Sequence, residues 1–127
     1  MATLADITFD ARHPASIARF WAAALDGYAV APYDDAELER LRSLGIGDVE
    51  DDPSVLVEGP AGAPRLFFTA VPEAKAAKNR VHLDLRAADV EAEVGRHVAL
   101  GARVIARHGT NVVLADPEGN EYCVDQG

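Results

Sequence analysis

Three residues whose side chains bind metals or move protons lie far apart in the chain: Asp6, His82 and Cys123. A carboxylate, an imidazole and a thiolate can together hold a divalent ion such as zinc and leave one coordination position open. The alternative is structural: Asp6 makes an ion pair or hydrogen bond, His82 hydrogen-bonds inside a cavity, and Cys123 packs as a small hydrophobe. We therefore assign no cofactor, with a divalent metal as the alternative.

His82 is also the one candidate for catalysis. The pKa of an unperturbed imidazole is about 6.5, so His82 could act as a general base or hydrogen-bond a bound ligand near neutral pH. A structural role is the competing hypothesis. Cys123 as a nucleophile would need a nearby base and a lowered pKa, which the sequence does not indicate. His13, His97 and His108 have no ligand spacing, and we expect them to face solvent or to cap turns.

Alternating strands would place the candidate residues on shared faces. Residues 5–10 and 81–85 alternate apolar and polar side chains, as half-buried strands do. In the second strand, His82 and Asp84 point away from the apolar residues, so they face a cavity if those residues pack under a helix. Applied to the other strands, the same alternation of side chains gives the full set of predicted pocket residues: Asp6, Thr8, Phe67, Thr69, His82, Asp84, Glu121 and Cys123. Among the aromatic residues, we expect only Phe67 in the pocket.

The rest of the pattern predicts one order of elements twice: a strand, a helix and three strands. The first set is residues 5–10, a helix at about 14–25, and strands 28–31, 54–58 and 65–71. Between the strands at 28–31 and 54–58 we expect a short helix that starts at Asp34 and Asp35 and ends at Gly45, followed by a loop at 47–53. The second set is residues 81–85, a helix capped by Asp89, and strands 103–106, 111–115 and 121–124. We expect Val90, Val94 and Val98 to face inward on the second helix, and an inward position is the alternative for His97. A duplicated unit or a chance coincidence would explain the repeat equally well.

Four segments resemble the glyoxalase-like branch of the vicinal oxygen chelate superfamily, which contains glyoxalase I and the bleomycin-resistance proteins. They are residues 20–27 (FWAAALDG), 71–75 (VPEAK), 78–85 (KNRVHLDL) and 116–124 (DPEGNEYCV). The resemblance implies an α+β fold in which two paired βαβββ modules form a partly open, barrel-like sheet around a cavity, with helices outside. It predicts a single domain, 1–127, with module one at about 4–72 and module two at about 80–125. It also implies a homodimer.

The resemblance also indicates which residues stand at the metal-ligand positions. In metal-using members, histidine and carboxylate ligands lie on the first and last strands of the modules. These positions fall here on Asp6, His82 and Cys123, with a fourth near Thr69, and only His82 keeps the usual ligand type.

The leading hypothesis is that the cavity binds a small organic molecule, with or without a metal. His82, Asp6 and Thr69 would set its polarity, and Phe67 would supply apolar contact. One alternative is a metal-dependent lyase, isomerase or dioxygenase acting on a small oxygenated substrate. The other is a non-catalytic structural domain.

Composition limits the other function classes. With 21 acidic and 12 basic residues among 127, the net charge of −9 repels nucleic acid. No apolar run approaches the roughly 20 residues that cross a bilayer, so we expect no membrane span. A single cysteine and no leader-like segment favour the cytoplasm. The acidic segment 34–52 would be either a lid or surface decoration, and we favour the second.

Overall fold

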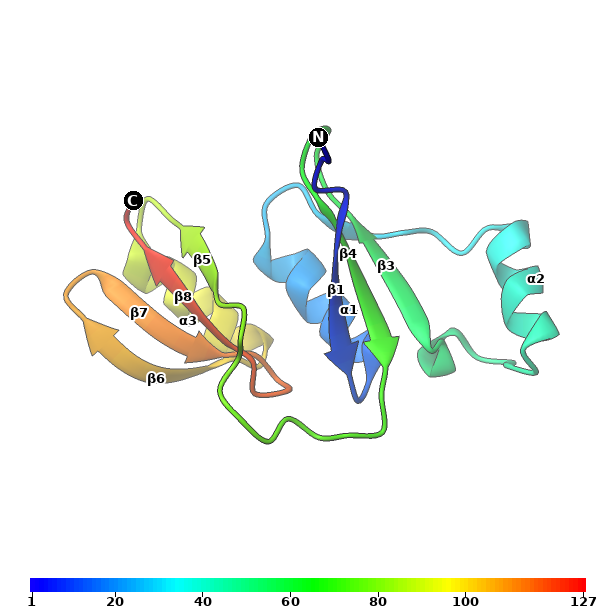
Figure 1. The fold of residues 1–127 in the computed structure, drawn as a ribbon. Coiled ribbons are helices and arrows are strands. Elements are labelled where there is room, and N and C mark those ends of the chain that lie inside the picture. Colours follow the sequence, from blue (N-terminus) through cyan, green and yellow to red (C-terminus); the bar gives the residue numbers. More distant parts are fainter. The chain divides into compact units, whose positions relative to one another are not determined.

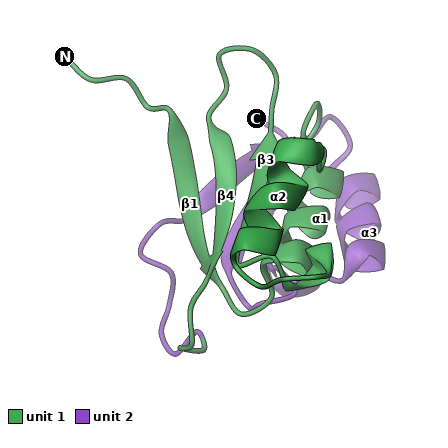
Figure 2. Cartoon of the chain, turned by 90° about the vertical axis from the view of Figure 1, so that its right-hand side faces the viewer, with its two compact units in different colours: residues 1–74 green, residues 75–127 purple.

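The computed structural model describes residues 1–127, which divide into two compact units, residues 1–74 and residues 75–127 (Figures 1 and 2). Each unit has a four-stranded mixed sheet and a long helix that packs on one of its faces. None of the helices has both the length and the apolar character needed to cross a membrane.

Unit 1 is a βαβββ module with an insertion. Its elements are β1 (Asp6–Ala11), α1 (Pro14–Ala24), β2 (Ala29–Val30), α2 (Asp35–Ser43), the 3-10 helix η1 (Val49–Asp51), β3 (Ser54–Glu58) and β4 (Arg65–Ala70). The strand order is β1-β4-β3-β2, with β1 parallel to β4 and the other pairs antiparallel. The segment with α2 and η1 is inserted between β2 and β3.

Unit 2 repeats this topology without the insertion. Its elements are β5 (Leu83–Arg86), α3 (Val90–Leu100), β6 (Arg103–His108), β7 (Asn111–Ala115) and β8 (Glu121–Asp125). The strand order β5-β8-β7-β6, with β5 parallel to β8, matches that of unit 1 element by element. The predicted α+β fold of two βαβββ modules is confirmed, and each sheet is open at both edges.

The core of unit 1 lies between α1 and one face of its sheet. Pro14 begins the helix, where a missing N–H costs nothing, and Trp21 is buried on its inner side. Phe9 stacks on Phe68 with ring centroids 5.0 Å apart and lies 6.1 Å from the Trp21 ring. Because strand side chains alternate, Thr8 and Phe67 point to the opposite face, which α1 does not cover.

The core of unit 2 corrects two sequence predictions. α3 begins after Asp89, whose Oδ1 accepts the Ala92 N–H at 3.0 Å, and it buries Val94 and His97. His97 is 0% exposed, although we favoured a solvent-facing or capping role over an inward position, and Val98 is 46% exposed, although we expected it inside. Val94 and His97 are buried and Val90 is half-buried, so at 3.6 residues per turn Val98 falls on the flank of this inward-facing stripe.

Smaller differences concern element ends. The predicted strand 28–31 shrinks to the two residues that pair with β3, and the predicted loop 47–53 contains η1. β5 starts at Leu83, so His82 lies just before the strand. Element ends depend on partner strands and caps, which local sequence patterns describe poorly.

Candidate functional site

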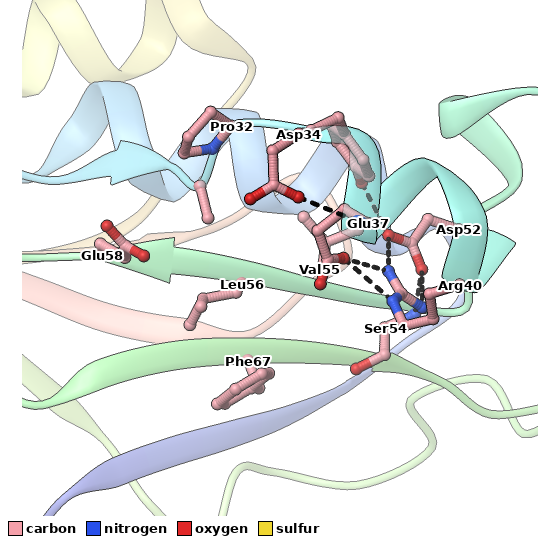
Figure 3. Close-up of a pocket in the computed structure, with 12 residues that line it drawn as sticks. Pro32, Asp34, Glu37, Arg40, Asp52, Ser54, Val55, Leu56, Glu58 and Phe67 are labelled. Atoms are coloured by element: carbon pink, nitrogen blue, oxygen red, sulfur yellow. Dashed lines mark hydrogen bonds and ion pairs between the residues drawn. The ribbon is translucent and has the colours of Figure 1, made fainter.

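A pocket of about 510 Å³ lies in unit 1 between the uncovered sheet face and the inserted segment (Figure 3). Phe67 of β4 and Leu56 of β3 form its apolar floor, and they are direct cross-strand partners. On its other edge Phe67 pairs with Thr8 of β1. The Arg65 guanidinium lies 5.4 Å from the Phe67 ring centroid, a cation–π contact that helps to fix the ring.

The wall of the pocket depends on the buried carboxylate of Asp52. Its Oδ2 accepts hydrogen bonds from Arg40 Nη2 at 2.9 Å and from the Tyr33 hydroxyl at 2.7 Å. Its Oδ1 accepts the Ser54 N–H at 2.9 Å. Asp52 is only 2% exposed, and a charge so buried needs such partners. These bonds attach α2 to the start of β3.

The same network sets the protonation states at the wall. Hydrogen bonds to Asp52 and Glu37 raise the pKa of Arg40, so its guanidinium stays charged. Burial, followed by the Asp52 hydrogen bond, raises the pKa of Tyr33, whose hydroxyl therefore remains a donor. Arg40 and Tyr33 therefore both remain hydrogen-bond donors to Asp52 at physiological pH.

The charge of the pocket lining is negative. Four carboxylates, those of Asp34, Glu37, Asp52 and Glu58, face a single cation, Arg40, which gives a formal charge of −3. Arg40 is already paired with Asp52 and Glu37. Such a lining favours a ligand that carries a positive charge beside an apolar part.

The other unit 1 candidates share the open face of the sheet but not the pocket lining. The Asp6 carboxylate accepts two hydrogen bonds from Arg65, at 2.7 and 3.1 Å, and this interaction lowers the pKa of Asp6. Thr8 is exposed, and Thr69 pairs with Ser54 and Asp10 across the sheet. Among the predicted residues of unit 1, Phe67 is the one that lines the pocket.

In unit 2 the structure brings together His82, Asp84 and Cys123. One ligand atom from each lies within 4.8 Å of the other two. Asp84 and Cys123 are register partners on the parallel strands β5 and β8, and the Cys123 thiol donates to Asp84 Oδ1 at 2.9 Å. His82 Nε2 lies 3.7 Å from the same oxygen. Asp84 thus joins His82 and Cys123, whereas Asp6 is engaged with Arg65 in unit 1.

The donor types in this cluster suit a divalent ion. An imidazole, a carboxylate and a thiolate are zinc ligands, and around one tetrahedral ion they would lie ~3.5 Å apart, so small side-chain rotations would suffice. The thiol itself is in its neutral form: burial, followed by the hydrogen bond to Asp84, raises the pKa of Cys123. A neutral buried thiol is a poor nucleophile, which argues against thiol catalysis.

Glu121 holds the linker between the units onto β8. Its carboxylate accepts Lys75 Nζ at 2.9 Å and the Asn79 N–H at 3.0 Å. The Lys75 hydrogen bond, followed by the Asn79 one, lowers the pKa of Glu121 to about 2. Glu121 was predicted as a pocket residue, and it lines a separate pocket in unit 2.

Sequence reasoning missed most of the unit 1 wall. Leu56 and Ser54 could have been found, because the predicted hairpin 54–58/65–71 puts them on the face of Phe67. Tyr33, Arg40 and Asp52 were not identified, because the acidic segment 34–52 that carries Arg40 and Asp52 was predicted to be surface decoration, whereas Arg40 of α2 and Asp52, directly after η1, line the pocket. Their role depends on contacts between residues 12 to 19 positions apart.

The chain matches the model of the glyoxalase-like domain over residues 6–124. No curated protein sequence is significantly similar to it.

Three solved structures illustrate the likeness in fold. A glyoxalase/bleomycin resistance protein/dioxygenase family enzyme from Burkholderia phytofirmans PsJN is 17% identical with a TM-score of 0.66, covering 98% of both chains. The fosfomycin resistance protein FosX from Mesorhizobium loti is 16% identical with a TM-score of 0.67, covering 100% of this chain and 93% of FosX. A bleomycin-binding protein complexed with bleomycin is 16% identical with a TM-score of 0.54, covering 99% of both chains.

Proposed function

Because the chain belongs to the glyoxalase-like domain family, we propose that it binds a small organic molecule, and that the unit 1 pocket is where it does so. The pocket itself is the observation that carries the proposal: about 510 Å³ above an apolar floor of Phe67 and Leu56, with charged groups on its walls. Ligand pockets typically measure about 300–1,000 Å³ and combine an apolar lining with a few fixed polar groups.

The surroundings of the pocket favour a planar, positively charged ligand. An aromatic or otherwise flat group would stack on the Phe67 ring, and an amine or amidine would face Glu58 and Glu37. The bonded set of Tyr33, Arg40 and Asp52 holds the wall in place before the ligand arrives. A preformed wall reduces the entropy cost of binding.

One of the solved structures supports a binding role, because it is a bleomycin-binding protein in complex with bleomycin. Another is named for fosfomycin resistance. We infer from the resemblance that this chain sequesters its ligand without turning it over. We also keep the homodimer as a prediction, to be checked by sedimentation equilibrium.

A pair of matched probes tests the proposal. Benzamidine and benzoate have the same size and planarity but opposite charges. We expect benzamidine to shift the amide resonances of Leu56 and Phe67, and benzoate to leave them unchanged. Phe67→Ala should weaken benzamidine binding about tenfold, whereas Thr8→Ala, on the same face but outside the lining, should not. Equal responses to both probes, or none, would overturn the proposal.

The cluster of His82, Asp84 and Cys123 supports a second candidate function, a metal-dependent lyase, isomerase or dioxygenase. A divalent ion held there would supply a Lewis acid that polarises a substrate oxygen. The chain's own residues would provide the three ligands and leave a position for substrate.

Elemental analysis separates this second candidate from the first. The protein would be incubated with zinc, nickel, iron(II) or manganese and then desalted. Stoichiometric metal that is lost in both His82→Ala and Cys123→Ala would support it, and Asp6→Ala serves as the control in unit 1. If the protein retains no metal, the metal-dependent function is excluded.

A further inference from the structure

Unit 2 contains a pocket that the proposed function does not use. It is an open groove of about 610 Å³ between residues 75–78 of the linker, β6 and the turn before β8. Its lining combines three cations, Lys75, Lys78 and Arg103, with two carboxylates, Glu118 and Glu121. The formal charge of the lining is therefore +1, opposite in sign to the unit 1 pocket and to the whole chain, which carries −9.

Hydrogen bonds hold the linker along this groove. Glu121 accepts Lys75 Nζ at 2.9 Å and the Asn79 N–H at 3.0 Å, and Lys75 also donates to the Ala77 carbonyl. These bonds balance the charge of Lys75. They also hold the backbone on both sides of Lys78, so that this side chain starts from a defined position at the rim.

The two remaining cations of the lining have no such partners. Lys78 and Arg103 make no ion pair and no side-chain hydrogen bond, whereas Arg107 on the same strand as Arg103 is paired with Glu91. An ammonium and a guanidinium at one groove provide several N–H donors for an oxyanion. They are available because no carboxylate of the protein is bound to them.

The floor of the groove is apolar and partly open to solvent. Ile105 is 49% exposed and lies at a bulge, where the register between β6 and β7 shifts between Val104 and Ala106. Val113 of β7 lies beside it in the lining. A bulge redirects a side chain out of the regular alternation, and here it leaves an aliphatic surface next to two free cations.

We propose that this groove binds small organic anions: carboxylates or phosphate monoesters that carry a short apolar group. The oxyanion is held by Lys78 and Arg103, and the apolar group covers Ile105 and Val113. This site is independent of the unit 1 pocket, which has the opposite charge and different residues. Each site can therefore fail without the other.

Phenyl phosphate is the probe, with inorganic phosphate and benzylamine as comparisons. We expect phenyl phosphate to shift the amide resonances of Lys78, Ile105 and Gly119. Inorganic phosphate should bind more weakly because it lacks the apolar contact, and benzylamine should not shift these resonances. Affinity should fall as salt is added, because the contacts at the rim are exposed to solvent.

Variants identify the two cations. Lys78→Gln and Arg103→Gln should each weaken phenyl phosphate binding about tenfold, the loss expected for one charged hydrogen bond. Arg107→Gln is the matched control on the same strand and should bind as the wild type does. Amide spectra of the free variants check that the fold is intact. The proposal is overturned if phenyl phosphate does not bind, if its shifts lie elsewhere, or if Arg107→Gln loses as much affinity.

The design also distinguishes this proposal from the proposed function. Benzamidine shifts at Leu56 and Phe67 should persist unchanged in Arg103→Gln. Phenyl phosphate shifts should likewise persist in Phe67→Ala. A loss of both in one variant would show that the two sites are not independent and would overturn the assignment of the groove.

Discussion

Arg40 Nη2 lies 2.9 Å from Oδ2 of Asp52, a carboxylate that is almost completely buried beneath α2. Replacing Arg40 with Met keeps much of the side-chain volume but leaves the buried charge with only Tyr33 and the Ser54 N–H. We expect Arg40→Met to lower the free energy of unfolding by roughly 2 kcal/mol, less than for a fully buried pair because Arg40 is 34% exposed. Urea denaturation measures the change.

Arg42, two residues further along α2, provides the control. It pairs with Glu39 at 2.8 Å, but both side chains are about two-thirds exposed. Arg42→Met should therefore change stability by less than about 0.5 kcal/mol. If the two variants unfold at the same urea concentration, Asp52 does not depend on Arg40, and the pocket wall is not held as described.

The hydroxyl of Tyr122 matters for the core of unit 2. It lies 2.9 Å from Nδ1 of His97, inside a core where both residues are buried. Tyr122→Phe removes this hydroxyl and should cost about 1–2 kcal/mol of unfolding free energy. Tyr28→Phe is the control: its hydroxyl donates to the Pro64 carbonyl at 2.8 Å in a part-buried position where water can take its place. A larger loss in Tyr28→Phe would contradict the prediction.

Glu121 should make stability depend on pH in the acidic range. Its pKa falls to about 2 in the folded protein, against about 4.3 for an unperturbed glutamate. A lowered pKa stabilises the fold above the unfolded value, and the stabilisation is lost as pH falls through about 2. Glu121→Gln should therefore be less stable than wild type by about 1 kcal/mol at pH 6, after allowance for solvent screening.

The difference should shrink at pH 3, where part of the stabilisation is already gone in the wild type. Chemical denaturation at pH 6 and pH 3 measures it. Glu73→Gln, at an exposed position two residues before Lys75, should show no such change with pH. A constant difference between Glu121→Gln and wild type at both pH values would mean that the carboxylate's charge is not what stabilises the linker.

Strand alternation explains why so much of the fold could be predicted from sequence. Apolar and polar residues alternate around Ile7 and Phe9 and again around Leu83, because one face of each strand packs under a helix. This pattern can be recognised within a few neighbouring residues. The ends of the second helix also depend on nearby residues: Asp89 caps α3, and Gly101, with φ 118°, ends it. These features need no knowledge of distant residues.

The candidate sites could be predicted only in part. The alternation of side chains along the strands predicted that Asp84 and Cys123 face inward. Their contact depends on the register between β5 and β8, which the pattern within each strand does not determine. Asp6 was grouped with His82 and Cys123 because the family resemblance aligns metal-ligand positions with these three residues, and Arg65 was not recognised as the partner of Asp6. Arg65 and Asp6 are register partners on strands 59 positions apart, a separation that no local pattern describes.

Cys123 should react slowly with alkylating reagents while the protein is folded. Its side chain is 3% exposed, and burial and the Asp84 hydrogen bond raise its pKa, so little thiolate is present at pH 7.5. Because it is the single cysteine, iodoacetamide labelling followed by mass spectrometry reports on it alone. Asp84→Asn removes the adjacent negative charge and should raise the labelling rate about threefold or more.

Asp125→Asn tests whether the effect is specific to Asp84. Asp125 also raises the pKa of Cys123, but more weakly, and its carboxylate accepts a hydrogen bond from Thr110 at 2.7 Å. We expect a smaller increase in the labelling rate for this variant, with EDTA present in every sample. Equal rates in Asp84→Asn and wild type would show that burial alone protects the thiol. In that case the Cys123–Asp84 contact would have no measurable influence on the charge state of the cluster.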